Sequence, residues 1–112
     1  MEVWRKVKGF EDYEISNLGR IKSFKNRYVW ILKGTINKSG YRSIILRNGK
    51  LKKSYLIHQI VAIAFLHHKP CGHDLIVDHI NENKLDNRLK NLQLITQKEN
   101  ALKSRIFRGY NG

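Results

Sequence analysis

Alternating apolar and polar positions near the start of the chain predict short strands joined by tight turns. Residues 4–7, 13–16 and 20–23 combine this alternation with the β-branched and aromatic residues that favour strands. Residues 16–19, Ser-Asn-Leu-Gly, have side chains typical of a turn, so the second and third strands should form a hairpin. The beginning of the chain is therefore expected to be antiparallel β structure.

A second hairpin is the clearest strand prediction. Residues 41–47 and 51–57 are strand-like runs on either side of Asn48-Gly49. This dipeptide is typical of a type I′ turn, because both central residues of such a turn take a positive φ. The polar positions of the hairpin are almost all basic, so one surface of its sheet should be strongly charged.

The second half of the chain begins with a helical pattern. Apolar residues between positions 57 and 66 recur at the i, i+3, i+4, i+7 spacing of one helix face, which predicts a largely buried helix. A loop containing proline and glycine follows. Residues 75–77 then predict a short apolar strand that leads directly to Asp78 and His79.

A strand and a second helix follow. Residues 92–95 suit a strand, and the next four residues, Thr-Gln-Lys-Glu, form a capping box. In a capping box Thr96 accepts a hydrogen bond from the Glu99 amide, and the Glu99 side chain reaches back to the Thr96 amide. A helix should therefore begin near Gln97 and end at Gly109.

These elements predict an α+β fold. A small N-terminal antiparallel β-sheet region and a helix should be followed by a strand–loop–strand–helix core. The chain of 112 residues fits one domain, or one small domain with an extension. We place the boundary between a basic β-rich region, residues 1–56, and the core, residues 57–112.

The charge of the chain changes this picture by indicating a partner. The sequence has 22 lysines and arginines against 9 acidic residues, a net charge of +13, and residues 1–57 carry 14 of these bases with only four acids. Such a surface favours a polyanion, whereas the alternative is a solvated face with lysines that protect sheet edges. The candidate nucleic-acid contacts are Arg20, Lys22, Arg42, Arg47, Lys50, Lys52, Lys53, Lys84 and Arg88.

The compartment follows from what the sequence lacks. No apolar run approaches the roughly 18 residues that span a bilayer, and the N-terminal residues lack the apolar stretch of a secretory signal. Cys71 is the single cysteine, so an intramolecular disulfide is excluded. We expect a cytosolic protein.

Three polar residues in the core region are candidates for phosphodiester chemistry. Side chains of a helix lean toward its N-terminus, so Asn100 should point back toward Asp78 and His79 at the strand end. A carboxylate and an amide oxygen are suitable ligands for Mg²⁺, which usually takes only one or two ligands from protein. A neutral histidine is a suitable base for water. Asp78 and Asn100 are thus candidate metal ligands, and His79 is the candidate base.

The same residues carry a family resemblance. Val77-Asp78-His79-Ile80, the loop over residues 81–88, Asn91-Leu92 and the closing Thr96-x-x-Glu99-Asn100 resemble the HNH endonucleases, in particular their H-N-N branch in phage and intron-encoded homing endonucleases. The resemblance implies a ββα-metal core. It also implies that His79 is the general base and that Asn91 holds the loop and orients that histidine. Asn100 stands where many relatives have histidine, which points to a metal pair of Asp78 and Asn100.

A second resemblance covers the N-terminal region. The pattern Trp4-x4-Gly-Phe-Glu-x-Tyr-x-Ile-Ser-Asn-x-Gly-Arg-Ile-x-Ser23 is similar to the nuclease-associated modular motif that commonly precedes HNH cores. The two matches follow in the order usual for that family. Only 12 residues follow Asn100, so we do not expect within this sequence the C-terminal helix-turn-helix module of many relatives.

The combined expectation is a DNA endonuclease that uses one divalent metal ion, Mg²⁺ with Mn²⁺ as the alternative. It should nick double-stranded DNA and leave 5′-phosphate and 3′-hydroxyl ends, as a monomer or weak dimer without an obligate protein partner. A phage or mobile element in a bacterial host is the expected source, and the host cytoplasm the expected location. The alternatives are a non-catalytic DNA-binding module and an RNA-binding protein whose exposed aromatics stack on bases, namely Tyr28, Trp30 and Tyr41.

Two other groups of histidines have less specific interpretations. His67, His68, Cys71 and His73 could suggest a zinc site, but their spacing is not a common structural-zinc pattern, and surface or phosphate contacts are favoured. His58 opens the predicted buried helix and is interpreted as a partly buried core histidine, with a phosphate contact as the alternative.

Overall fold

The computed structural model describes residues 1–25, 28–69 and 75–109, with the backbone alone for residues 104–109. It has the expected α+β architecture, in which every strand pair is antiparallel. Cys71 and His73 lie outside the described residues. The elements are β1 (Trp4–Val7), β2 (Phe10–Ser16), β3 (Ile21–Ser23), β4 (Trp30–Leu32), β5 (Thr35–Ile36), β6 (Arg42–Asn48), β7 (Leu51–Leu56), α1 (Ile57–Phe65), β8 (Ile76–His79), η1 (Leu89–Asn91), β9 (Leu92–Ile95) and α2 (Gln97–Gly109).

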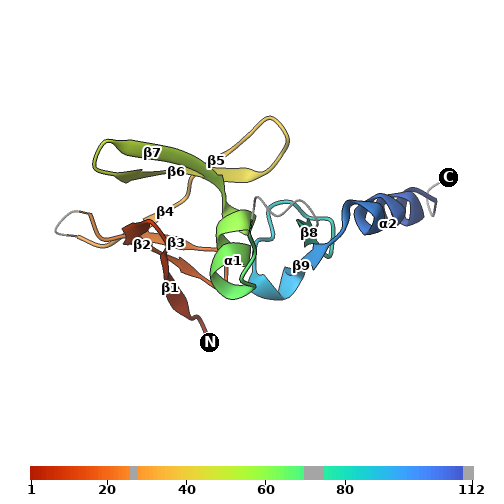
Figure 1. The fold of residues 1–112 in the computed structure, drawn as a ribbon, viewed down its shortest axis with the longest axis horizontal. Helices are drawn as coiled ribbons and strands as arrows, with labels where there is room; N and C mark the ends of the chain where they lie inside the picture. Colours follow the sequence, from red (N-terminus) through yellow and green to blue (C-terminus); the bar gives the residue numbers. More distant parts are fainter. Residues whose placement is uncertain (26–27, 70–74, 110–112) are drawn as a thin grey trace.

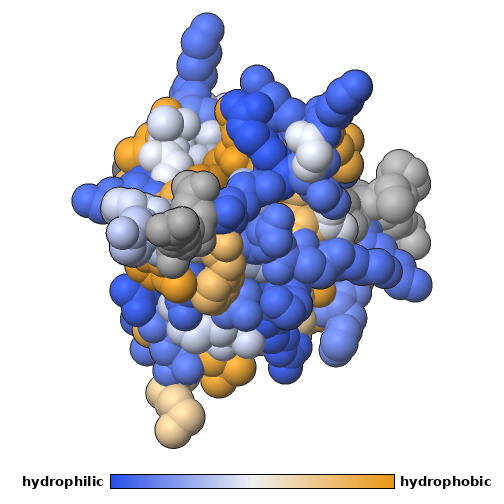
Figure 2. All heavy atoms as spheres, turned by 90° about the vertical axis from the view of Figure 1, so that its left-hand side faces the viewer, coloured by the Kyte–Doolittle hydropathy of each residue, from blue (hydrophilic) through white to orange (hydrophobic). Residues whose placement is uncertain are grey.

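The strands form three separate sheets around one helix. β1 to β4 pair in chain order, β5 to β7 form a second sheet, and β8 pairs with β9. Figure 1 shows α1 between the two larger sheets and the β8–β9 pair, with α2 extending away at the opposite end. Hydrophilic side chains, broken by separate apolar patches, cover much of the face at the sheet end of the molecule (Figure 2).

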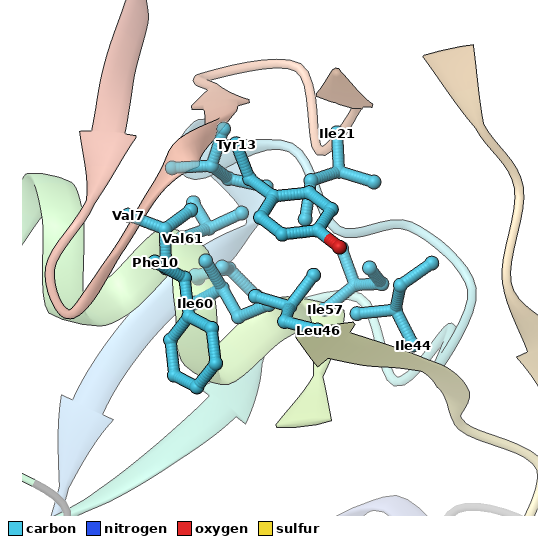
Figure 3. Close-up of a cluster of buried hydrophobic side chains, with 11 residues drawn as sticks. Val7, Phe10, Tyr13, Ile21, Ile44, Leu46, Ile57, Ile60 and Val61 are labelled. Atoms are coloured by element: carbon cyan, nitrogen blue, oxygen red, sulfur yellow. The ribbon is translucent and has the colours of Figure 1, made fainter. Parts of the chain in front are cut away.

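One hydrophobic core joins the sheets to the strand–loop–strand–helix unit. Ile15 and Ile21 from the first sheet and Leu46 from the second are almost fully buried against Ile57 and Val61 of α1 (Figure 3). β9 adds a buried leucine, Leu92. Burial of each such side chain stabilises the fold by about 1.5–3 kcal/mol. The helix therefore fixes the position of the β8–β9 pair relative to both sheets.

The observed cap of α2 agrees with the one predicted from the sequence, whereas the turn of the β6–β7 hairpin differs from the predicted one. The capping box is present, because Thr96 Oγ1 accepts from the Glu99 amide and Glu99 Oε1 from the Thr96 amide, each at 3.0 Å. The prediction of a type I′ turn at Asn48-Gly49 was wrong. Asn48 pairs with Leu51, so the two central residues are Gly49 and Lys50, and of these only Gly49 has a positive φ, 61°. Glycine at the first central position is the pattern of a type II′ turn.

Three short elements, β4, β5 and η1, were not predicted from the sequence. β4 and β5 contain only three and two residues, and both are largely exposed, so no alternation of burial marks them. η1 is a single 3₁₀ turn of three residues before β9. Pairing with longer neighbours, rather than local sequence pattern, defines the two short strands.

The turn between β2 and β3 packs against the loop that follows β8. The Leu89 amide donates to the carbonyl oxygen of Asn17 at 2.7 Å. Gly19, with φ +80°, lies so close that a Cβ atom there would be 2.8 Å from the carbonyl oxygen of Asn87. Glycine is therefore required both by its backbone conformation and by this approach. The N-terminal sheet in this way supports the loop next to the end of β8.

We predict that Gly19→Ala destabilises the protein more than Gly9→Ala. Both glycines have a positive φ, which costs alanine about 1–2 kcal/mol, but a Cβ at Gly9 meets nothing within 4 Å. The collision with Asn87 should add about 1–3 kcal/mol for Gly19→Ala. Urea denaturation of both variants measures this, and equal losses of unfolding free energy would contradict the close packing.

Candidate active site

A pocket of about 240 Å³ brings together the predicted chemical residues. Asp78 and His79 at the end of β8 and Asn100 in the first turn of α2 all line it. The capping box places Asn100 there, because it starts α2 immediately after β9. The remaining lining residues are Tyr41, Ile76, Val77, Glu82 and Lys84.

His79 is held by a neighbouring asparagine. Its side chain is only 6% exposed, and its Nε2 lies 2.9 Å from Oδ1 of Asn87. An amide oxygen only accepts hydrogen bonds, so Nε2 of the neutral ring carries the proton. Nδ1 then keeps a lone pair and can accept a proton. This is the protonation state that a general base requires.

Asn91 holds the loop after β8, as the resemblance implies, but the side-chain hydrogen bond to the His79 ring comes from another residue. Its Oδ1 accepts from the Asn81 amide at 3.0 Å, and its Nδ2 donates to Asn81 Oδ1 and to the Asp86 carbonyl, both at 2.9 Å. These bonds hold the loop between β8 and η1. The hydrogen bond to the His79 ring comes from Asn87, eight residues away in sequence.

The loop itself is built from successive asparagine turns. Asn81 Oδ1 accepts from the Asn83 amide at 2.8 Å, and Asn83 Oδ1 accepts from the Leu85 amide at 3.0 Å. Glu82 between them has a positive φ of 64°. Asparagine side chains favour such turns because they bond to backbone two residues on. No local signal in the sequence separates Asn87, which bonds to the His79 ring, from these turn-forming asparagines.

Asp78 is buried beside a lysine that sequence reasoning did not identify. Asp78 is 7% exposed, and its Oδ2 accepts from Gln93 Nε2 at 2.8 Å and from Lys103 Nζ at 2.6 Å. Lys103 also donates to the His79 carbonyl at 2.8 Å and pairs with Glu82 at 2.9 Å. Burial would lower the pKa of Lys103, but the bonds to Asp78 and Glu82 raise it. Lys103 therefore ties α2 to the end of β8.

The donor set is compatible with a hard divalent cation. Asp78 offers a carboxylate and Asn100 an amide oxygen to the same pocket, and Mg²⁺ takes few protein oxygens and leaves the others to water and phosphate. Among the side chains that the structure describes, no group of three or more His, Cys, Asp or Glu is placed to hold a metal.

Two rings pack against the candidate base, His79. The Tyr41 ring stacks on His79 with centroids 6.0 Å apart, and the His58 ring meets His79 edge-on at 4.7 Å. Burial, with a smaller effect of the His79 charge, lowers the pKa of His58 to about 4. His58 is therefore neutral at neutral pH, and its buried Nδ1 has no hydrogen-bond partner among the described residues.

Several of the predicted nucleic-acid contacts bond to the protein itself. Arg20 pairs with Glu2, and Arg88 forms two bonds of 2.7 Å to Asp86. These partners lower the pKa of each carboxyl to about 2. Lys22 Nζ lies over the Trp4 ring, 3.9 Å from the ring centroid. Arg42 and Lys84 donate to backbone carbonyls of Lys33 and Ser39, each at 2.9 Å.

The β6–β7 hairpin presents the other predicted basic contacts. Arg47, Lys50, Lys52 and Lys53 are all exposed along it. Arg47 and Lys52 are directly opposite each other in the ladder. Like charges in that position destabilise a sheet, so this arrangement suits a surface that meets a polyanion.

Two of the aromatic residues considered for base stacking are on the surface. Tyr28 is 69% exposed and Trp30 55%, whereas Tyr41 is half-buried against His58 and His79. Within the described parts of the chain, no helix is long and apolar enough to cross a membrane.

Family comparisons divide the chain into two consecutive parts. Residues 2–47 match the NUMOD4 motif, and residues 48–102 match an HNH endonuclease family. Both resemblances found in the sequence are therefore confirmed, in the order expected.

Individual relatives agree with these families. The chain is 39% identical over 99 residues to the DNA endonuclease I-HmuI of Bacillus phage SP01, covering 88% of this chain and 55% of that protein. It is 35% identical over 106 residues to the uncharacterized HNH endonuclease L247 of Acanthamoeba polyphaga mimivirus, covering 89% of this chain and 25% of that one. The chain thus spans from a quarter to about half of these relatives.

A solved structure has the same fold. It comes from work on DNA binding and cleavage by the HNH homing endonuclease I-HmuI, and it superposes with a TM-score of 0.80 at 37% identity. The match covers 96% of this chain and 59% of the other.

We predict that Lys103→Met lowers stability, whereas Lys98→Met on the exposed side of α2 does not. Loss of Lys103 removes charged hydrogen bonds from the buried Asp78, which should cost about 1.5–3 kcal/mol. Thermal denaturation without metal measures both variants. An unchanged melting temperature for Lys103→Met would show that this ion pair does not hold α2 in place.

Proposed function

Because the chain belongs to the HNH endonucleases and carries a NUMOD4 motif, we propose that it is a metal-dependent enzyme that nicks double-stranded DNA. The observation that carries the proposal is the single pocket lined by Asp78, His79 and Asn100. His79 in that pocket is held through Nε2, so that Nδ1 can act as a base.

The proposed reaction is hydrolysis of a phosphodiester. His79 Nδ1 takes a proton from a water molecule, whose oxygen forms a bond to phosphorus as the bond to the 3′ oxygen breaks. The departing 3′ oxygen takes up a proton from solvent, so the products are a 5′-phosphate and a 3′-hydroxyl end. Asp78 and Asn100 would hold a divalent ion, Mg²⁺ or Mn²⁺, which when bound supplies positive charge at the phosphate and the departing oxygen. Asn87 and Asn91 keep the ring and its loop in place.

Binding and chemistry are assigned to different parts of the chain. We assign DNA binding to residues 1–56, in particular to the exposed bases of the β6–β7 hairpin, and phosphodiester chemistry to residues 57–112. Neutralised phosphates release counterions, so affinity should fall steeply with salt. One such site cuts one strand per engagement, which favours nicking over double-strand cleavage by a monomer or weak dimer.

The biological setting is proposed from the relatives. Several are encoded by bacteriophages or a prophage. We propose that this chain also derives from a phage or mobile element and acts in the cytoplasm of a bacterial host, without an obligate protein partner.

A plasmid assay tests the proposed function. Supercoiled plasmid is incubated with Mg²⁺, Mn²⁺ or EDTA and the intact protein or His79→Ala. We expect metal-dependent conversion to open circles by the intact protein, and a loss of at least about 100-fold in rate for His79→Ala, because general-base catalysis contributes about 10²–10⁴-fold.

DNA binding is the control in the same assay. Both proteins should bind duplex DNA equally in EDTA. His79 is buried at the end of β8, and Figure 1 shows β8 and the β6–β7 turn on opposite sides of α1. Binding without nicking under every metal would leave a non-catalytic DNA-binding module. Stronger binding of single-stranded RNA than of duplex DNA would favour the exposed Tyr28 and Trp30 as a base-stacking surface.

A further inference from the structure

The candidate pocket has one wall that comes from the N-terminal region. Tyr41 directly precedes β6, within the part of the chain that matches the NUMOD4 motif, yet it lines the pocket with Asp78, His79 and Asn100. The turn between β5 and β6 lies at the end of its sheet that is nearer β8 (Figure 1). The site is therefore assembled from both family regions.

Tyr41 contacts the candidate base through the face of its ring. The planes of Tyr41 and His79 are 26° apart, with centroids at 6.0 Å. His58, from the start of α1, contacts both rings, at 5.1 Å from Tyr41 and 4.7 Å from His79. The Asn87 hydrogen bond fixes one edge of the imidazole, whereas these two rings restrict its plane.

Tyr41 is itself fixed by the turn in which it lies. Asn37 Oδ1 accepts hydrogen bonds from the Ser39 and Tyr41 amides, each at 3.0 Å. Lys84 donates to the Ser39 carbonyl at 2.9 Å and lies 4.9 Å from the Tyr41 ring centre. The turn is thus joined to the loop that follows β8.

We propose that Tyr41 is a positioning residue for the nuclease site, which keeps the His79 ring aligned for proton transfer from within the N-terminal region. This inference rests on the proposed nuclease function. Its physical basis is the strong dependence of proton transfer on alignment, since a small misplacement of a catalytic group costs a large factor in rate. The NUMOD4-matching region then contributes to catalysis as well as to DNA binding.

The test compares nicking rate with DNA affinity in three variants. Single-turnover nicking and duplex binding are measured for Tyr41→Phe, Tyr41→Leu and Tyr55→Leu. Tyr55 is a half-buried tyrosine in β7 that packs on Phe10, away from the pocket, and serves as the matched control. Tyr41→Leu should nick roughly tenfold or more slowly at unchanged DNA affinity, because it loses the flat ring that restricts His79. Tyr41→Phe keeps that ring and should nick at close to the wild-type rate.

An additional variant covers the case in which Tyr41→Leu does not fold. Asn37→Ala removes the two side-chain hydrogen bonds within the turn, keeps its two backbone hydrogen bonds and leaves the pocket residues unchanged. This variant should also nick more slowly at unchanged affinity. Wild-type rates in Tyr41→Leu, or in Asn37→Ala if the former is unfolded, would overturn the inference. So would an equal loss in Tyr55→Leu. Absence of nicking by the wild-type protein would instead contradict the proposed function itself.

Discussion

The packing of α1 against two sheets is the constraint on which the rest of the structure depends. Ile57 and Val61 of this short helix are completely buried among side chains of β2, β3 and β6, and the same core includes Leu92 of β9. The strand pair that ends in Asp78 and His79 is too small to be stable alone. Its position is therefore set by a core that belongs mostly to the N-terminal region.

Polar contacts hold the side chains of Asp78 and His79 in the position that the core gives to their strand. Gly19 in the β2–β3 turn lies close against the backbone of Asn87. The Asn87 side chain is hydrogen-bonded to Nε2 of His79. Lys103 of α2 forms an ion pair with Asp78 and donates to the His79 carbonyl, which attaches α2 to the end of β8. A buried carboxylate and a buried imidazole are thus both paired, which avoids the cost of burying unpaired polar groups. The two family-matched parts of the chain consequently pack together around the candidate site.

The features that could be predicted from the sequence are those whose interacting residues lie close together in the chain. The capping box at Thr96 and Glu99 fixed the start of α2 correctly, because both partners lie within one helical turn. The α+β class and most strands were predicted for the same reason. The hairpin at Asn48 was wrong by one residue, since the ladder register places Gly49 first in the turn.

Contacts between distant segments could not be predicted. In the sequence Asn87 is not distinguished from the neighbouring loop asparagines, and no pattern marks Lys103. Tyr41 was expected among the exposed aromatics. Each acquires its role only after α1 packs the sheets against the β8–β9 pair. Sequence patterns therefore located three residues that share one pocket, Asp78, His79 and Asn100, whereas the residues that hold them depend on tertiary packing.

The most direct test is whether Asn87 leaves Nδ1 of His79 free to accept a proton. A long-range ¹H–¹⁵N NMR spectrum of the histidine side chains in their neutral form, with His79 assigned by substitution, measures this. We expect the neutral form of the His79 ring to carry its proton on Nε2 and to leave Nδ1 unprotonated, because Asn87 Oδ1 accepts from Nε2. A ring protonated on Nδ1, or one that averages between the two tautomers, would contradict the claim that the fold holds His79 as a base.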